Sequence, residues 1–173
     1  MFPELTLVLG GAASGKSAFA EGLAKGSGRG LIYLATAEVR DNEMRAKVYK
    51  HRQMRGQGWK TVEAPLDLGP VLNRAPGDHV VLLDCATMWL SNHMLAESDL
   101  TLAEAELMTA LSLAAAPVIV VSNEVGLSVV PENALARAFR DAQGRLNQKL
   151  ATKAGLVVNV IAGLPQVLKG TLP

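Results

Sequence analysis

Short, uninterrupted apolar runs alternate along this chain with longer segments whose apolar residues recur at helical spacing. The runs predict strands at residues 5–9, 31–35, 80–83, 118–121 and 156–161, and the alternating segment 59–63 predicts a strand at the sheet edge. The helical segments are 16–25, 41–55, 101–115 and a long one that begins at Pro131 and that Gly155 closes. This alternation predicts βαβ units, and therefore an α/β fold with a mostly parallel central sheet flanked by helices.

Composition agrees with a well-buried sheet and narrows the class of protein. Hydrophobic residues make up 49% of the 173 residues and aromatic residues only 4%, which predicts a large aliphatic core. The length is typical of one domain, 1–173, because domains contain roughly 100–200 residues. Seventeen Lys and Arg residues stand against sixteen Asp and Glu residues, a net charge of +1. We therefore expect no nucleic acid as a partner, since nucleic-acid binding requires a basic excess.

Cysteine content and apolar segment length indicate the compartment. The single cysteine, Cys85, cannot form an internal disulfide, which favours a reducing environment. The N-terminal apolar run has no basic residues before it and is too short for a signal peptide. No segment approaches the roughly 18 apolar residues of a membrane span. We therefore expect a cytoplasmic protein with no membrane span.

A phosphate-binding motif follows the first predicted strand and opens the first predicted helix. Its residues are Gly10, Gly11, Ala12, Ala13, Ser14, Gly15, Lys16 and Ser17, which match G-x-x-x-x-G-K-[ST] in full. Glycines allow the backbone N–H groups to surround a phosphate, and the helix N-terminus adds partial positive charge. Lys16 is expected to reach the β- and γ-phosphates, and the Ser17 hydroxyl to bind Mg²⁺. The alternative is a glycine-rich turn that contains Lys-Ser by coincidence.

A carboxylate is needed beside Ser17 to complete a magnesium site. Asp84 follows four apolar residues at the end of a predicted buried strand, where an unpaired acid is costly. It is the favoured second magnesium ligand, while a helix-capping role is the alternative. Glu124 is a weaker candidate at the same edge. Ligands bind at the carboxyl ends of parallel strands, so Thr36, Asp84 and Asn123 are expected to surround one crevice.

His51 occupies an unusual position on the predicted helix 41–55. Helical spacing places His51 on the inward stripe with Arg55 one turn later, and Arg52 is adjacent in sequence. A core histidine with both ring nitrogens satisfied is one interpretation. The other is a nucleophile facing the nucleotide, because a neutral imidazole that attacks phosphorus gives a phosphoramidate and adjacent cations favour the neutral form. Of the other histidines, His79 opens a strand and His93 is expected in a polar loop.

Further short sequence blocks, spread over nearly the whole chain, accompany the phosphate loop and His51. They are 33–37 (YLATA), 41–44 (DNEM), 51–55 (HRQMR), 59–63 (WKTVE), 82–92 (LLDCATMWLSN), 122–126 (SNEVG), 130–133 (VPEN), 139–141 (FRD), 147–148 (NQ) and 163–170 (GLPQVLKG). Together with the phosphate loop, these blocks resemble the bifunctional adenosylcobinamide kinase/adenosylcobinamide-phosphate guanylyltransferase family of cobalamin biosynthesis. Ordinary phosphate-loop kinases lack the 51–55 and 122–126 blocks, so the resemblance is specific.

The resemblance implies site residues. His51 matches the family's guanylylated histidine. The nucleotide-contacting segments match the phosphate loop together with Ala35, Thr36, Ala37, Arg52, Gln53, Met54, Arg55, Glu63 and Asp84. The resemblance also implies a cytoplasmic homotrimer whose subunits have a P-loop NTPase-like fold, a three-layer sandwich. Two departures are Ala13, where the family usually has Arg, and Gly56, where it often has Pro.

The same resemblance implies two reactions at one nucleotide site. ATP or GTP, with Mg²⁺, would phosphorylate the aminopropanol hydroxyl of adenosylcobinamide. GTP would then transfer GMP through His51 to adenosylcobinamide phosphate, giving adenosylcobinamide-GDP. Two alternatives remain from the residues alone: a phosphate-loop kinase without guanylylation, and a GTP-binding regulatory module.

Overall fold

The central sheet has the strand order β3-β2-β4-β5-β1-β6-β7, in a computed structural model that describes residues 2–38 and 56–173. The strands are β1 (Leu5–Gly10), β2 (Gly30–Ala35), β3 (Trp59–Glu63), β4 (His79–Asp84), β5 (Val118–Asn123), β6 (Leu156–Ile161) and β7 (Leu164–Lys169). Neighbouring strands are parallel except β7, which is antiparallel to β6. The predicted mostly parallel sheet is confirmed, and β3 lies at its edge as expected.

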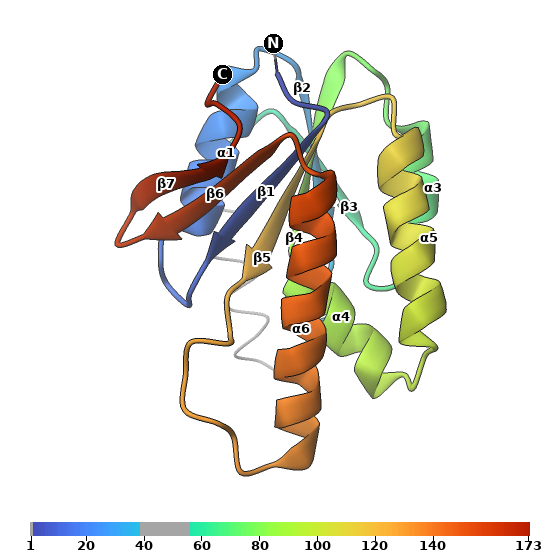
Figure 1. The fold of residues 1–173 in the computed structure, drawn as a ribbon. Helices are drawn as coiled ribbons and strands as arrows, with labels where there is room; N and C mark the ends of the chain where they lie inside the picture. Colours follow the sequence, from blue (N-terminus) through green and yellow to red (C-terminus); the bar gives the residue numbers. More distant parts are fainter. Residues whose placement is uncertain (1, 39–55) are drawn as a thin grey trace.

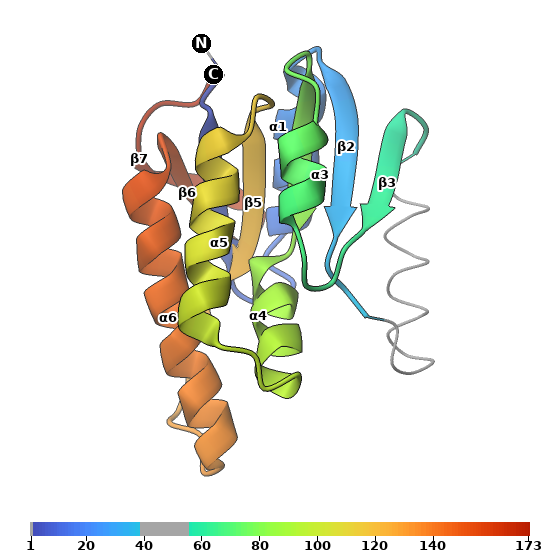
Figure 2. The ribbon, with the colours of Figure 1, turned by 90° about the vertical axis from the view of Figure 1, so that its right-hand side faces the viewer.

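Helices cover both faces of this sheet, giving three layers (Figure 1). They are α1 (Lys16–Gly26), α3 (Gly69–Arg74), α4 (Ala86–Leu95), α5 (Leu100–Leu113) and α6 (Ala134–Lys153). Among the described helices, α1 packs on one face, while α3, α4, α5 and α6 pack on the other (Figures 1 and 2). None of the helices in residues 2–38 and 56–173 combines the length and apolar character that crossing a membrane requires.

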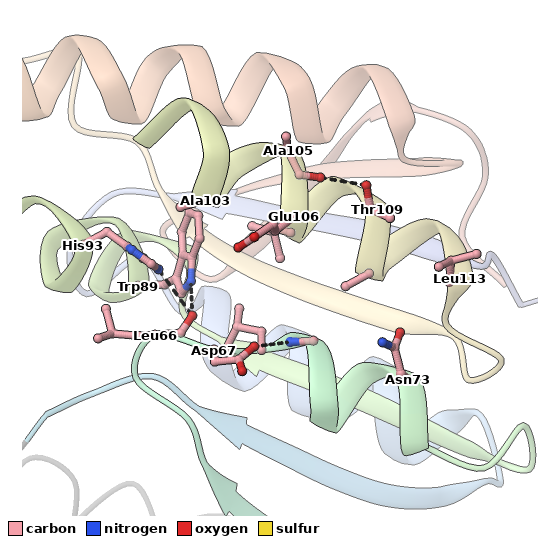
Figure 3. A pocket seen from close by; sticks show the side chains of 14 residues that line it. Leu66, Asp67, Asn73, Trp89, His93, Ala103, Ala105, Glu106, Thr109 and Leu113 are labelled. Atoms are coloured by element: carbon pink, nitrogen blue, oxygen red, sulfur yellow. Dashed lines mark hydrogen bonds between the residues drawn. The ribbon is translucent and has the colours of Figure 1, made fainter. Parts of the chain in front are cut away.

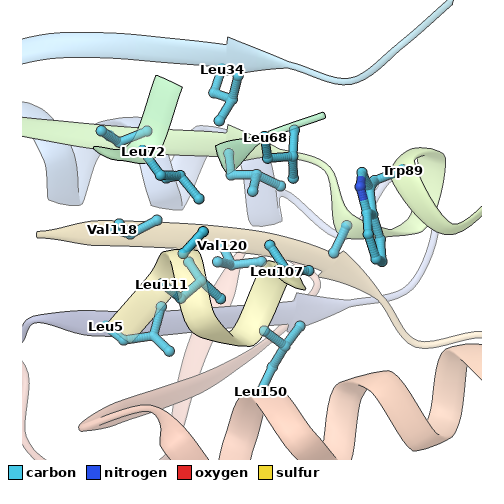
Figure 4. Packing of buried hydrophobic residues seen from close by; sticks show 14 of the residues in the cluster. Leu5, Leu34, Leu68, Leu72, Trp89, Leu107, Leu111, Val118, Val120 and Leu150 are labelled. Carbon is cyan, nitrogen blue, oxygen red and sulfur yellow. The ribbon is translucent and has the colours of Figure 1, made fainter. Parts of the chain in front are cut away.

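The core consists of two aliphatic clusters separated by the sheet. The larger cluster joins the sheet to α3, α4, α5 and α6, and Figure 4 shows Leu34, Val120 and Leu107 packed within it. The smaller cluster joins the other face to Ala20 and Ala24 of α1. Successive residues of each central strand enter alternate clusters, because side chains of a strand point to opposite faces. A strand residue's place in this alternation therefore shows which helix layer it faces.

The predicted start of the long helix α6 was wrong, whereas its predicted end was right. The helix begins after Asn133, whose side-chain oxygen accepts hydrogen bonds from the backbone N–H groups of Leu135 and Ala136. This asparagine cap, rather than Pro131, sets the first turn. At the other end the helix stops at Lys153 with Ala154 as its cap, and Gly155 follows directly, where it was predicted to close the helix. The Gly155 N–H donates to the Leu5 carbonyl oxygen of β1, at 2.9 Å.

Three elements were absent from the sequence prediction. Helices α3 and α4 follow β3 and β4, and α4 contains His93, which the prediction had placed in a polar loop. The third is β7, which forms a hairpin with β6 through a turn at Ala162 and Gly163, both with positive φ.

Candidate nucleotide-binding site

The phosphate loop lies between β1 and α1, as the motif predicts. The loop leaves β1 after Gly10 and passes through left-handed backbone at Ala13 (φ 56°) and Gly15 (φ 92°) before α1 begins at Lys16. The Lys16 ammonium group donates to the Gly11 carbonyl oxygen at 3.1 Å and so reaches back across the loop. This geometry brings backbone N–H groups, a helix N-terminus and a lysine to one place, which suits a polyphosphate.

Close packing explains why two glycines of the loop cannot be larger residues. A Cβ atom on Gly10 would lie 2.3 Å from the Ser14 Oγ and 2.7 Å from the Val160 carbonyl oxygen. A Cβ atom on Gly15 would lie 3.1 Å from the Cα of Gly163, and the Gly163 N–H donates to the Ser14 carbonyl oxygen at 2.8 Å. The β6–β7 turn therefore buttresses the phosphate loop. The sequence prediction missed this role of Gly163, since the β7 hairpin itself was missed.

Asp84 ends β4 on the same face of the sheet as α1. Val80 and Leu82 of β4 belong to the core cluster on the α1 side, and alternation places Asp84 on that side too. The Tyr33 hydroxyl donates to the Asp84 Oδ2 at 2.9 Å and orients the carboxylate. The residue that caps α4 is Cys85, without a side-chain capping bond, so Asp84 does not have the helix-capping role considered above.

Thr36 supports the backbone that follows Asp84. Its hydroxyl donates to the Cys85 carbonyl oxygen at 2.7 Å and accepts from the Cys85 N–H at 2.8 Å. The Thr36 carbonyl oxygen accepts from the Asn92 side chain at 2.8 Å, and Thr36 is fully buried. Burial, and next the neighbouring Asp84 carboxylate, raise the pKa of the Cys85 thiol to about 11. The thiol is therefore protonated at neutral pH and is a poor nucleophile.

The strand register brings other predicted residues to the same edge. Ala35 pairs with Asp84 on one side and with Glu63 on the other, so these three residues lie level at the carboxyl ends of β4, β2 and β3. Ala37 lies in the connection that leaves β2. Glu124 is less suited to bind a metal, because its Oε1 accepts from the Gly126 N–H at 2.6 Å.

The predicted nucleophile lies outside the described residues. The segment 39–55, which includes the whole of the predicted helix 41–55, contains His51, Arg52, Gln53, Met54 and Arg55. Their roles remain predictions.

The described residues fit a magnesium ion chemically. A serine hydroxyl at Ser17 and the oriented Asp84 carboxylate are hard oxygen donors, which Mg²⁺ prefers when nucleotide phosphates and water complete its shell. In residues 2–38 and 56–173, no cluster of three or more His, Cys, Asp or Glu residues could hold a metal without such help.

A separate cavity of about 550 Å³ lies on the opposite face, between α3, α4 and α5 (Figure 3). Trp89 Nε1 donates to the Leu66 carbonyl oxygen at 2.8 Å, and His93 Nε2 lies 3.3 Å from the same oxygen. Asp67 Oδ1 accepts from the Gly69 N–H at 3.2 Å. These contacts fix the connection from β3 to α3, while the His93 Nδ1 is buried and has no hydrogen-bond partner among the described residues.

Solved structures with the same fold indicate the class of protein. The flagellar accessory protein FlaH from Methanocaldococcus jannaschii matches with a TM-score of 0.55 and 14% identity, covering 98% of this chain and 80% of that chain. The RadB recombinase matches with a TM-score of 0.55 and 19% identity, covering 91% of this chain and 74% of that chain. At such identities the likeness concerns the fold alone. The fold and the phosphate loop together define a P-loop NTPase-like α/β protein.

Sequence comparison identifies the family. The model of the cobinamide kinase / cobinamide phosphate guanyltransferase family matches residues 6–168, and the chain belongs to this family of transferases. A bifunctional adenosylcobalamin biosynthesis protein, CobP, from Pseudomonas aeruginosa is 42% identical over 167 residues, which cover 95% of this chain and 96% of the relative. The Escherichia coli K12 protein of the same description, CobU, is 36% identical and covers 95% of this chain and 99% of its own length.

Proposed function

We propose that this chain phosphorylates the aminopropanol hydroxyl of adenosylcobinamide with ATP or GTP and then attaches GMP from GTP to the product. The observation that carries the proposal is a complete phosphate loop beside an oriented strand-end carboxylate, in a chain of this family. The chain would act as a single nucleotide-binding domain.

In the kinase step, the chain's own groups bind and neutralise the triphosphate. The loop N–H groups and Lys16 surround the β- and γ-phosphates, while Ser17 and Asp84 would hold Mg²⁺. When bound, the metal supplies further positive charge beside the phosphates. The acceptor hydroxyl oxygen forms a bond to the γ-phosphorus, the bond to the β–γ bridging oxygen breaks, and the hydroxyl proton passes to solvent. Preorganised positive charge stabilises the transferring group.

In the transferase step, His51 is the nucleophile. A ring nitrogen of His51 forms a bond to the α-phosphorus of GTP, and pyrophosphate leaves. A phosphate oxygen of adenosylcobinamide phosphate then forms a bond to the same phosphorus, and the phosphorus–nitrogen bond breaks. The product is adenosylcobinamide-GDP, and the histidine is regenerated.

We place the enzyme in the cytoplasm as a homotrimer, with the large corrinoid bound between subunits. The sheet and its helices occupy most of the described chain, which leaves little of it for a separate corrinoid-binding domain.

Incubation with GTP labelled at the α-phosphate tests the proposal. The wild-type protein should acquire label that is lost in acid and stable in alkali, as expected of a phosphoramidate. His51→Ala should abolish labelling, whereas His79→Ala should retain it, because His79 begins β4 at the opposite end of the strand from Asp84. Normal labelling of His51→Ala would refute the assigned nucleophile.

Lys16→Ala tests the kinase step separately. Phosphorylation of cobinamide should be lost, because the triphosphate loses its main side-chain cation. Full kinase activity in this variant would refute the phosphate-loop assignment. Phosphorylation by a wild-type protein that acquires no label would leave a kinase without guanylylation.

A further inference from the structure

Asn123 is the last residue of β5, and it lies at the carboxyl ends of the strands, between the phosphate loop and Asp84. In the sheet, β5 separates β1 from β4. The register pairs Asn123 with Gly10, where the phosphate loop begins, and pairs Asp84 with Val121. The next residue, Glu124, donates its N–H to the Gly10 carbonyl oxygen at 3.1 Å, so the chain beyond β5 stays beside the loop.

Strand alternation places the Asn123 side chain on the face where α1 begins. Ile119 and Val121 pack in the core cluster on the α1 side. Ser122 faces the other way, because its hydroxyl donates to the Asn147 Oδ1 of α6 at 2.6 Å. Asn123 therefore shares a face with Asp84 and with the start of α1.

A buried polar cluster holds the Asn123 backbone on both sides. Its N–H donates to the Thr87 hydroxyl at 2.8 Å, and its carbonyl oxygen accepts from the Asn147 Nδ2 at 3.1 Å. Asn147 is held in turn, since Gln143 Nε2 donates to both the Asn147 Oδ1, at 3.0 Å, and the Ser122 hydroxyl, at 2.9 Å. Buried polar groups are costly unless they are hydrogen-bonded, and this arrangement makes the backbone position of Asn123 rigid.

The Asn123 side-chain oxygen, by contrast, makes no hydrogen bond to this cluster. This Oδ1 atom is buried and has no hydrogen-bond partner among residues 2–38 and 56–173. A buried amide oxygen without a donor is unfavourable, and an amide group can both donate and accept.

We propose that the Asn123 amide binds the γ-phosphate end of the nucleotide and so distinguishes a triphosphate from a diphosphate. Its NH₂ group donates to a γ-phosphate oxygen, and its Oδ1 accepts from a donor on the second substrate, such as the acceptor hydroxyl of adenosylcobinamide. Thr87, Ser122, Gln143 and Asn147 act as positioning residues. This inference rests on the proposed function, since it assigns a further contact in the same site.

Calorimetric binding of two matched nucleotides tests this assignment on the full chain. The α,β-methylene analogues of GTP and GDP carry the guanosine and differ by the γ-phosphate, and their α–β link blocks guanylylation. Asn123→Ala should lower affinity for the triphosphate analogue about 10- to 100-fold, the loss expected for a hydrogen bond to a charged group. Affinity for the diphosphate analogue should change by less than about twofold. Asn123→Asp, which keeps the shape and adds negative charge, should weaken triphosphate binding further.

Asn159→Ala is the matched control. Asn159 pairs with Leu9 on the other side of β1, and alternation directs its side chain away from α1. Its ratio of triphosphate to diphosphate affinity should equal that of the wild type. An unchanged ratio in folded Asn123→Asp would overturn the inference while leaving the proposed function in place. Equal losses for both analogues would also overturn it, and failure of the wild type to bind either analogue would instead refute the proposed function.

Discussion

Replacement of Gly10 by alanine probes how tightly the phosphate loop is packed between β1 and β6. The new Cβ atom would lie 2.3 Å from the Ser14 Oγ and 2.7 Å from the Val160 carbonyl oxygen. The Ser14 hydroxyl can rotate, because it has no hydrogen-bond partner among the described residues. The Val160 carbonyl belongs to the β6 backbone, so the clash can be relieved only by moving the strand or the loop.

The size of the effect follows from this geometry. Forcing an extra methyl group into a close-packed site costs about 1–3 kcal/mol of unfolding free energy. For a chain of this length, each kcal/mol changes the melting temperature by roughly 2–4 °C. We therefore expect Gly10→Ala to lower the melting temperature of the nucleotide-free protein by about 2–12 °C, measured by calorimetry. Affinity for GTP should fall as well, since the loop N–H groups are displaced.

Gly11→Ala is the control within the same loop. A Cβ atom on Gly11 would meet no atom within 4 Å, and its φ is not positive. Its melting temperature without nucleotide should therefore stay within about 2 °C of the wild type, because open-surface substitutions change stability by about 0.5 kcal/mol or less. Equal melting temperatures for the two variants would refute the packing argument.

Three further predictions concern the site and the core. Tyr33→Phe removes the hydrogen bond that orients Asp84 and should raise the Mg²⁺ concentration for half-maximal kinase activity by about tenfold; an unchanged titration would contradict that role. The Cys85 thiol, with its pKa raised to about 11, should resist iodoacetamide in the native protein at pH 8 and react once the protein is unfolded in urea; rapid native alkylation would show that it is ionised. Leu83→Ala empties a fully buried position and should cost about 2–5 kcal/mol in urea unfolding, whereas a loss below about 1 kcal/mol would show that the core closes over the cavity.

The central strands could be predicted because their apolar runs are unbroken and buried on both faces. Residues 80–83 and 118–121 lie within β4 and β5, and these strands extend further, to Asp84 and Asn123 respectively. The phosphate loop could be predicted for a different reason: its chemistry requires a fixed spacing of glycine and lysine within one short segment.

The missed elements lack such local signals. Every residue of β7 is exposed and the strand contains Pro165, so its sequence has no alternating apolar pattern. Helix α4 buries Thr87 and Asn92 together with Trp89, because each polar side chain bonds a specific distant backbone group. The support of the loop by Gly163 depends on tertiary contact alone, and nothing in the local sequence indicates it.

The position of β1 has a consequence for how the protein forms during synthesis. The strand is made first, yet both of its neighbours, β5 and β6, come from the last third of the chain. Such long-range pairing is slow, because distant segments must meet before either edge of β1 is covered. On the ribosome, an apolar strand with two open edges must therefore wait while most of the polypeptide is translated. The phosphate loop cannot make its contact with Gly163 until the β6–β7 turn has been translated. We therefore expect the nascent chain to bind chaperones, because its apolar surface stays exposed until then.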